Sequence, residues 1–344
     1  MIDWSDPKRT DVIRFQMVDP NNLDEVYGDM EDVQLGSSPI TYGYYADTRY
    51  SSKISFLADN NYVDKAWIRI IHEVPSEGYF EELGTFIPTS PAVEYGGAVK
   101  KSLTLQSPLW GLSNDLVTKA FSVGKNCSIL SAIKRVCETC NRPYLLQNPN
   151  DCLTSQSIVY EAGESYLTVL FDLASAAGNR LDVDGHGRIT LSPMPDFRYL
   201  SPLWELDADD SRSMIVQGTV KMESESDEIP NRVLVICKSY VGVADLPAGS
   251  EHSAAQRGYV LAAAYSESKV SSSSQAKSLA QMYLDAYCDV AQWTMQTLYF
   301  PAHCGDTVIF TINGERHLCM IQSIDPVDLA TMTMTITLEE VANG

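Results

Sequence analysis

The chain has 344 residues, with 45 aspartates and glutamates against 25 lysines and arginines, and a formal net charge of -20 at pH 7. Its 44% of hydrophobic residues can supply a sizeable core and exclude global disorder, and the length suggests about two or three domains. The excess of carboxylates argues against binding of DNA or RNA phosphates. Without a long apolar run or a basic amino terminus, we expect neither a membrane span nor an export signal.

Residues 1–108 are predicted to form a first β-barrel domain. Short apolar runs with a period of two are separated by turn residues, as in an antiparallel sheet. Ile13, Phe15 and Met17 share one face, and a turn follows at residues 19–22. Further strands are expected at 40–46, 53–58, 66–74, 80–87 and 98–106, with Leu103 and Leu105 facing inward in the last.

Residues 109–200 are predicted to form a small α/β domain, because the hydrophobic period changes to 3.6. Two amphipathic helices are expected, one at 129–140 behind a Ser128 N-cap and one at 166–177 before Gly178. An Asn-Arg pair and a short apolar strand follow each helix. The Asp184-Gly185 pair between two apolar segments predicts a hairpin over 181–191.

Residues 201–344 are predicted to form a second β-barrel domain that carries one helix. A strand is expected at 231–236, a long surface loop at 241–258 and the helix at 274–289. Four further strands are expected at 292–300, 306–312, 316–324 and 331–341. In the last of these, methionine, isoleucine and leucine alternate with threonines, so one face of the strand should be buried.

The segment from Asp182 to Pro193 resembles the start of a calcium-binding loop. Acids stand at its first and third positions and glycines follow, but the twelfth position, which needs a glutamate, is Pro193. The hairpin turn is therefore the preferred interpretation.

Eight cysteines, at positions 127, 137, 140, 152, 237, 288, 304 and 319, are interpreted as reduced thiols. Cys137 and Cys140 have the spacing of metal ligands, and Cys127 and Cys152 could complete a set of four. Both motif cysteines also continue the apolar stripe of their helix, so packing is the preferred explanation and the metal question stays open.

No catalytic, cofactor-binding or metal-binding residue is predicted. Ser-x-x-Lys spacings such as Ser131 with Lys134 lack their companion motifs, and the adjacent His303 and Cys304 are interpreted as a strand boundary. Three acidic pairs could serve glycoside hydrolysis only if two carboxylates faced each other at the right separation. These pairs are Glu81-Glu82, Asp209-Asp210 and Glu339-Glu340.

Several sequence segments, taken in this order, resemble those of the tail-hub (baseplate-hub) proteins of tailed bacteriophages. They are Glu164-Ser165-Tyr166-Leu167-Thr168-Val169-Leu170, the 181–189 hairpin, Asn231-Arg232-Val233-Leu234-Val235, Tyr299-Phe300-Pro301 and Gly305-Asp306-Thr307-Val308. The resemblance implies a mainly β fold with α+β insertions, in which two β-barrel domains flank a small α/β domain.

By that resemblance, the protein is a structural, non-enzymatic virion protein that is assembled in the host cytoplasm. Three copies would present six barrels to a hexameric tail tube. The expected partners are the chain itself as a homotrimer, a tail tube or distal tail protein, tail tip or fibre proteins and a tape-measure protein. Three copies at -20 each carry -60, so DNA would pass through the channel without specific binding.

Two other functions are compatible with the sequence. One is a tail-tip cell-wall hydrolase that uses the acidic pairs. The other is a carbohydrate-binding β module, for which the five tryptophans and 18 tyrosines could supply stacking surfaces.

Overall fold

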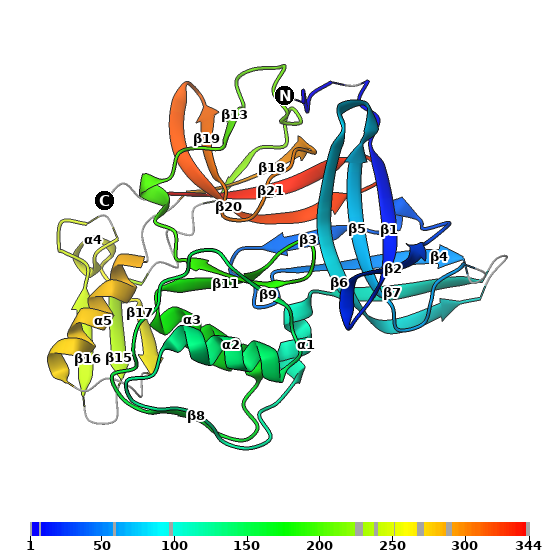
Figure 1. The fold of residues 1–344 in the computed structure, drawn as a ribbon. Helices are drawn as coiled ribbons and strands as arrows, with labels where there is room; N and C mark the ends of the chain where they lie inside the picture. Colours follow the sequence, from blue (N-terminus) through cyan, green and yellow to red (C-terminus); the bar gives the residue numbers. More distant parts are fainter. Residues whose placement is uncertain are drawn as a thin grey trace.

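The computed structural model describes residues 2–6, 8–57, 60–95, 99–223, 230–236, 240–250, 252–266, 272–286 and 291–341. The chain is mainly β, as the sequence predicts, and its largest element is a 13-stranded sheet. Figure 1 shows this sheet above the helices of the middle segment, with a smaller α/β unit at one side. Among the helices in the described ranges, none is both long and apolar enough to cross a bilayer.

The amino-terminal half of the large sheet contains seven strands paired in the order β3-β4-β7-β6-β5-β1-β2. The strands are β1 (Val12–Asp19), β2 (Asn22–Asp29), β3 (Ile40–Gly43), β4 (Tyr50–Leu57), β5 (Trp67–Val74), β6 (Tyr79–Glu94) and β7 (Lys100–Gln106). Leu103 and Leu105 are buried as predicted. Strand β2 was not predicted, because it lies at the sheet edge and most of its side chains are exposed, so hydrophobic alternation is lost.

The carboxy-terminal half contributes six strands to the same sheet. They are β13 (Trp204–Asp207), β14 (Lys221–Glu223), β18 (Gln292–Leu298), β19 (Thr307–Ile312), β20 (Glu315–Asp328) and β21 (Thr333–Glu340). In β21 the side chains of Met334, Ile336 and Leu338 are buried, which confirms the predicted face. Strand β20 pairs with β3, so the two ends of the chain form one continuous sheet.

The middle of the chain forms three helices and two small sheets beneath the large one. The helices are α1 (Pro108–Asn114), α2 (Ile129–Thr139) and α3 (Tyr166–Ala176); β8 (Phe121–Val123) pairs with β10 (Ile158–Tyr160), and β12 (Ile189–Pro193) lies between β9 (Tyr144–Leu146) and β11 (Asn179–Val183). The Ser128 hydroxyl caps α2 by accepting a hydrogen bond from the Ser131 amide at 3.0 Å. One hydrophobic core runs through this region and the large sheet. Short 3₁₀ turns occur at Leu35–Ser37, Pro75–Glu77 and Phe197–Tyr199.

A small α/β unit is inserted between β14 and β18, which pair directly with each other. It contains β15 (Arg232–Ile236), β16 (Val241–Asp245), α4 (Ala254–Arg257), β17 (Ala262–Ser266) and α5 (Ser273–Ala286), and it has its own hydrophobic core. The prediction of a surface loop over 241–258 is therefore wrong at both ends. Glycine and alanine suggested a loop, but a Cβ at Gly242 would lie 2.1 Å from the Ala276 carbonyl oxygen of α5, so the small residues serve close packing. Residues 287–289 of the expected helix lie outside the described ranges.

Candidate functional site

The tip of the β11–β12 hairpin is docked against the amino-terminal half of the large sheet. The Thr85 hydroxyl on β6 donates a hydrogen bond to the Gly185 carbonyl at 2.8 Å. A Cβ at Gly185 would lie 2.0 Å from the Glu82 carbonyl oxygen, so only glycine allows this approach. The following Gly187 has a φ of +94°, which also favours glycine. The hairpin turn predicted from Asp184-Gly185 is confirmed, and its tip is an inter-segment contact.

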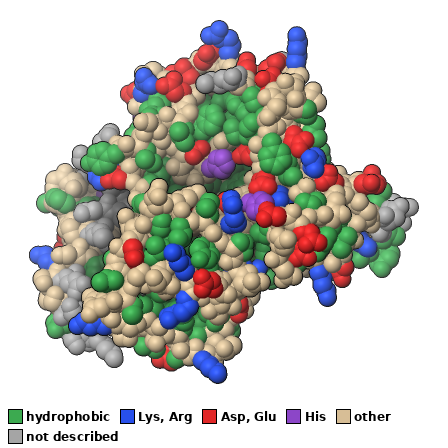
Figure 2. All heavy atoms as spheres, viewed as in Figure 1, with side chains coloured by type: hydrophobic (Ala, Val, Ile, Leu, Met, Phe, Trp, Pro, Cys, Tyr) green, Lys and Arg blue, Asp and Glu red, His purple; other side chains and the backbone are tan. Residues whose placement is uncertain are grey.

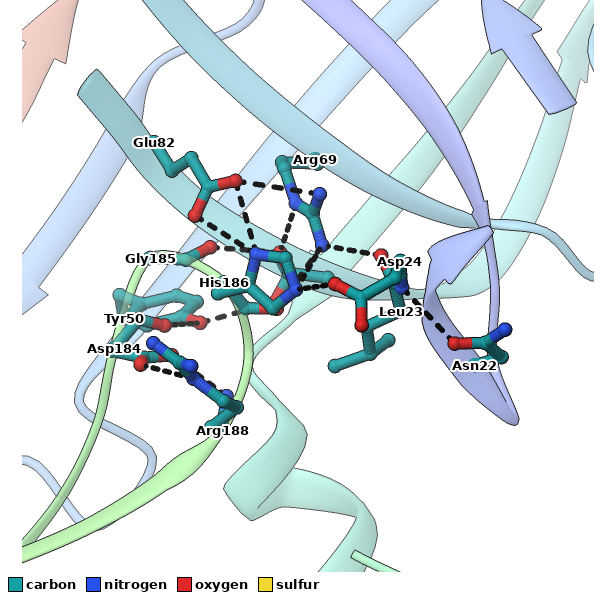
Figure 3. A network of polar contacts seen from close by, with 11 residues as sticks. Asn22, Leu23, Asp24, Tyr50, Arg69, Glu82, Asp184, Gly185, His186 and Arg188 are labelled. Atoms are coloured by element: carbon teal, nitrogen blue, oxygen red, sulfur yellow. Dashed lines mark hydrogen bonds and ion pairs between the residues drawn. The ribbon is translucent and has the colours of Figure 1, made fainter. Parts of the chain in front are cut away.

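His186 at this tip contacts two carboxylates from two strands, as Figure 3 shows. Its Nδ1 lies 3.1 Å from the Glu82 carboxylate of β6, and its Nε2 lies 3.1 Å from the Asp24 carboxylate of β2. The buried Arg69 of β5 donates to the Leu23 carbonyl at 2.8 Å and lies 3.4 Å from Glu82. Burial lowers the pKa of Arg69, and Glu82 opposes that change. Four segments are thereby held together by charge-assisted contacts.

The acids of the calcium-like segment are paired with arginines. Asp182 accepts a hydrogen bond from Arg180 at 2.6 Å, and Asp184 accepts one from Arg188 at 2.8 Å. No group of three or more metal-ligating side chains occurs among the described residues. The acids here stabilise the hairpin.

A second polar cluster surrounds Glu81, which joins the two halves of the large sheet. Its carboxylate accepts hydrogen bonds from the hydroxyls of Tyr79 and Tyr299 and lies 3.1 Å from Nε2 of His303. Burial raises the pKa of Glu81, but the hydrogen bonds from His303 and the tyrosines prevail, so the net pKa is lowered. The hydrogen bond to Glu81 raises the pKa of His303. The rings of Tyr79 and Tyr299 pack edge-on against Trp4.

A cavity of about 240 Å³ lies beside this cluster, where both sheet halves meet the docked hairpin. Its lining includes Tyr42, Arg49, Asp182, His303 and Cys304. Figure 2 shows hydrophobic side chains around a hollow on this face, with a histidine within it. Acidic and basic side chains both line the cavity.

In each of the candidate acidic pairs, the two carboxylates contact different groups and do not act together. Glu81 and Glu82 contact different clusters, as described above. Asp209 accepts hydrogen bonds from the backbone of the 313–314 turn, and Asp210 accepts one from Arg212. Glu339 accepts from Tyr45 and Gln322, while Glu340 lies 3.0 Å from a ring nitrogen of His317. These contacts position turns and strands.

Of the two cysteines of the metal-like motif, Cys137 is buried on α2, as expected from its spacing. Cys140 is the residue that follows the helix, and it is partly buried against the same core. Burial raises the pKa of both Cys137 and Cys140 to about 12. Cys127 and Cys152 are exposed. Cys304 has a pKa raised to about 12 by burial, while the neighbouring His303 contacts Glu81. A thiol in such surroundings is a poor nucleophile.

Sequence reasoning did not find either polar cluster. Glu81 and Tyr299 are 218 residues apart, and Glu82 and His186 are 104 apart. The only local signal was the Gly-His-Gly sequence at 185–187, where two small residues flank a side chain that needs a partner.

No family model matches the sequence, and no curated protein matches it. Solved structures do share its fold. A tail protein from Neisseria meningitidis MC58 aligns over 96% of both chains, with a TM-score of 0.69 and 12% identity. The 43 kDa tail protein of prophage MuSo2 from Shewanella oneidensis aligns over 96% of this chain and 98% of its own, with a TM-score of 0.68 and 12% identity. A prophage tail protein from Listeria monocytogenes EGD-e aligns over 95% and 94%, with a TM-score of 0.57 and 12% identity. The chain therefore has the fold of phage tail proteins.

Proposed function

We propose that this chain is a structural protein of a bacteriophage tail and that it resides in the virion. The observation that carries the proposal is the fold likeness, which extends over nearly the whole length of this chain and of three tail proteins. A likeness of that extent includes the middle segment and both ends of the large sheet. It is more informative than a match to one common domain.

More specifically, the protein is a trimeric tail hub that joins a hexameric tail tube to the tail tip or fibre proteins. Each copy contributes two sheet halves as the barrel-like walls of a ring around the DNA channel. One half is β1–β7, and the other is β13, β14 and β18–β21. The continuous pairing of β20 with β3 supports this arrangement, because it fixes one half rigidly beside the other. The net charge of -20 per copy supports passage of DNA without adhesion.

The proposed role is not enzymatic. The buried or partly buried carboxylates that could do acid–base work are committed to hydrogen bonds that hold strands and turns together. A catalytic pair needs two carboxylates that face a common substrate. Peptidoglycan zymography and a glycan array test the two alternatives, hydrolase and carbohydrate-binding module, and a positive result in either would contradict the structural role.

The decisive experiment is the mass and symmetry of the purified full chain. Sedimentation velocity from micromolar to millimolar concentration should show a species of three 38.0 kDa chains, and negative-stain images should show a threefold ring. Mixing with the tail tube protein of the same phage should give a complex. A monodisperse monomer over the whole range would overturn the hub proposal.

A further inference from the structure

His186 lies between groups that favour different protonation states of its ring. Its Nδ1 lies 3.1 and 3.2 Å from the two carboxylate oxygens of Glu82. Its Nε2 lies 3.1 Å from the Asp24 carboxylate, which accepts hydrogen bonds, and 3.3 Å from Nη2 of Arg69, which donates them. Figure 3 shows these groups converging on the ring from three strands. Because Nε2 faces both a donor and an acceptor, its partner depends on whether it carries a proton.

The protonated and neutral rings therefore have different partners. An imidazolium donates from Nδ1 to Glu82 and from Nε2 to Asp24. A neutral ring has one N–H, which belongs on Nδ1, because Glu82 accepts there and Arg69 can donate to a bare Nε2. In that state the lone pair of Nε2 faces the Asp24 carboxylate and repels it. Histidine changes charge between about pH 5 and pH 8, so a moderate change of pH exchanges one partner for the other.

Other charged side chains near the ring do not replace these partners. On the hairpin itself, Asp184 accepts a hydrogen bond from Arg188 at 2.8 Å. Glu138 of α2 and Arg142, which follows that helix, line the same cavity as His186. In the described part of the chain, neither of them forms a hydrogen bond or ion pair with the ring. The partner of the ring thus depends on the groups from β2, β5 and β6.

The β1–β2 turn needs such a contact, because its backbone pairing is irregular. Strand β2 is an edge strand, and its register on β1 shifts twice. Leu23, Asp24 and Glu25 have no opposite residue in the described pairing of the two strands. Leu23 has the one buried side chain of β2, and its carbonyl accepts a hydrogen bond from Arg69 at 2.8 Å. The contact of Asp24 with His186 is the second tether of this segment.

We propose that protonation of His186 tethers the β1–β2 turn to the hairpin through Asp24, and that loss of the proton releases the turn. The turn, the end of α2 and the hairpin line a cavity of about 440 Å³, and both residues belong to its lining. Release of the turn moves one wall of this cavity, so the cavity is narrower in mild acid than in mild alkali. The inference concerns the single chain and does not depend on the proposed role in the tail.

A double-mutant cycle at two pH values tests the contact. Asp24→Asn, His186→Gln and the doubly substituted chain are compared with the unsubstituted chain by urea denaturation at pH 5.5 and pH 8.0. Asp24 also attracts Arg69 at both pH values, and the cycle cancels that part. At pH 5.5 the two positions should be coupled by about 2- to 5-fold in the unfolding constant, as for an exposed ion pair. At pH 8.0 the coupling should be absent or of opposite sign.

Glu25→Gln is the matched control, because Glu25 is the next residue of β2, is exposed and carries the same charge. Its cycle with His186→Gln should show no coupling that changes with pH. Equal coupling of Asp24 and His186 at both pH values, or coupling at neither, would overturn the proposal. A pH-dependent coupling of the same size at Glu25 would also overturn it, since the effect would then not depend on the contact.

Hydrogen exchange followed by mass spectrometry measures the release itself. After correction for intrinsic rates, amides of residues 20–29 should exchange about 2- to 5-fold more slowly at pH 5.5 than at pH 8.0. This difference should vanish in Asp24→Asn, and equal protection at both pH values in the unsubstituted chain would overturn the release. Circular dichroism melting checks that each variant is folded. Asp24 is 87% exposed, so Asp24→Asn keeps the test decisive even where His186→Gln does not fold.

Discussion

The Tyr299 hydroxyl donates a hydrogen bond to the Glu81 carboxylate at 2.7 Å, and the two residues lie 218 positions apart. Tyr299 follows β18 in the carboxy-terminal half of the large sheet, whereas Glu81 lies on β6 in the amino-terminal half. Their contact is buried beneath the ring of Trp4. It therefore stabilises the junction of the two halves beyond the backbone pairing of β20 with β3.

Tyr299→Phe should lower the free energy of unfolding by about 1.5–3 kcal/mol, because it removes a hydrogen bond to a charged acceptor without opening a cavity. Urea denaturation measures the change. Tyr95→Phe is the control, since that side chain is 85% exposed and the same substitution there should cost less than about 0.5 kcal/mol. Equal effects at the two positions would contradict the role assigned to the junction.

The contact between Glu81 and His303 should make stability depend on pH. The pKa of His303 is raised by Glu81, so its contribution is fully present below the unfolded histidine value of about 6.5 and is lost as pH rises through the raised value. The pKa of Glu81 is lowered, so its contribution is present above about 4.3 and is lost on acidification.

Denaturation of the unsubstituted chain and of His303→Gln between pH 5 and pH 9 measures the His303 part. The stability difference between the two proteins should be largest near the acidic end and should shrink as pH rises. Its size should be modest, since the His303 side chain is 67% exposed and solvent screens the pair. A difference that stays constant with pH would show that His303 acts through packing alone.

Gly185→Ala should destabilise the protein by about 3 kcal/mol, since the new methyl group would overlap the Glu82 carbonyl at the docked hairpin. Gly249→Ala is the matched control, because no atom lies within 4 Å of a Cβ there. Thermal unfolding compares the two variants. If both melt alike, the hairpin tip is not held as closely as the structure indicates.

Thiol reactivity should separate the buried and exposed cysteines. Cys127 and Cys152 are exposed and should react readily with a maleimide at pH 7.5. Cys137 should be protected in the folded protein, because burial and a pKa raised to about 12 leave little accessible thiolate. Mass spectrometry after timed labelling reads each site. Fast labelling of Cys137, or zinc bound in proportion to the chain, would contradict helix packing as its role.

The inserted α/β unit should be dispensable for folding of the remainder. Glu223 and Gln292 pair directly, so replacing residues 224–291 with an Asn-Gly turn should close a hairpin. The unit has a separate hydrophobic core, so the main core keeps its contacts except those of Ala291. A single cooperative unfolding transition, with less helical circular dichroism, is expected. Aggregation or loss of cooperativity would mean that the unit supports the large sheet.

Local patterns in the sequence predicted most elements. Alternation located β4, β7 and β21, and helical periodicity located α2, behind its Ser128 cap, and α3, because these elements bury one face and leave the other more open. Edge strand β2 and the Gly- and Ala-rich β16 were missed. The residue types in these strands are set by contacts with segments that are distant in the sequence, such as the α5 backbone that packs against Gly242.

By itself, the sequence determined the strand and helix periods, the acidity and the hairpin at 184–187, since each depends on residues within a few positions of one another. Tertiary structure alone decided that both ends of the chain share one sheet and that Glu81 meets Tyr299 and His303. It also decided that His186 lies between Glu82 and Asp24. Such contacts join residues far apart in the sequence and depend on the order of the strands in the sheet. The local hydrophobic period does not contain that order.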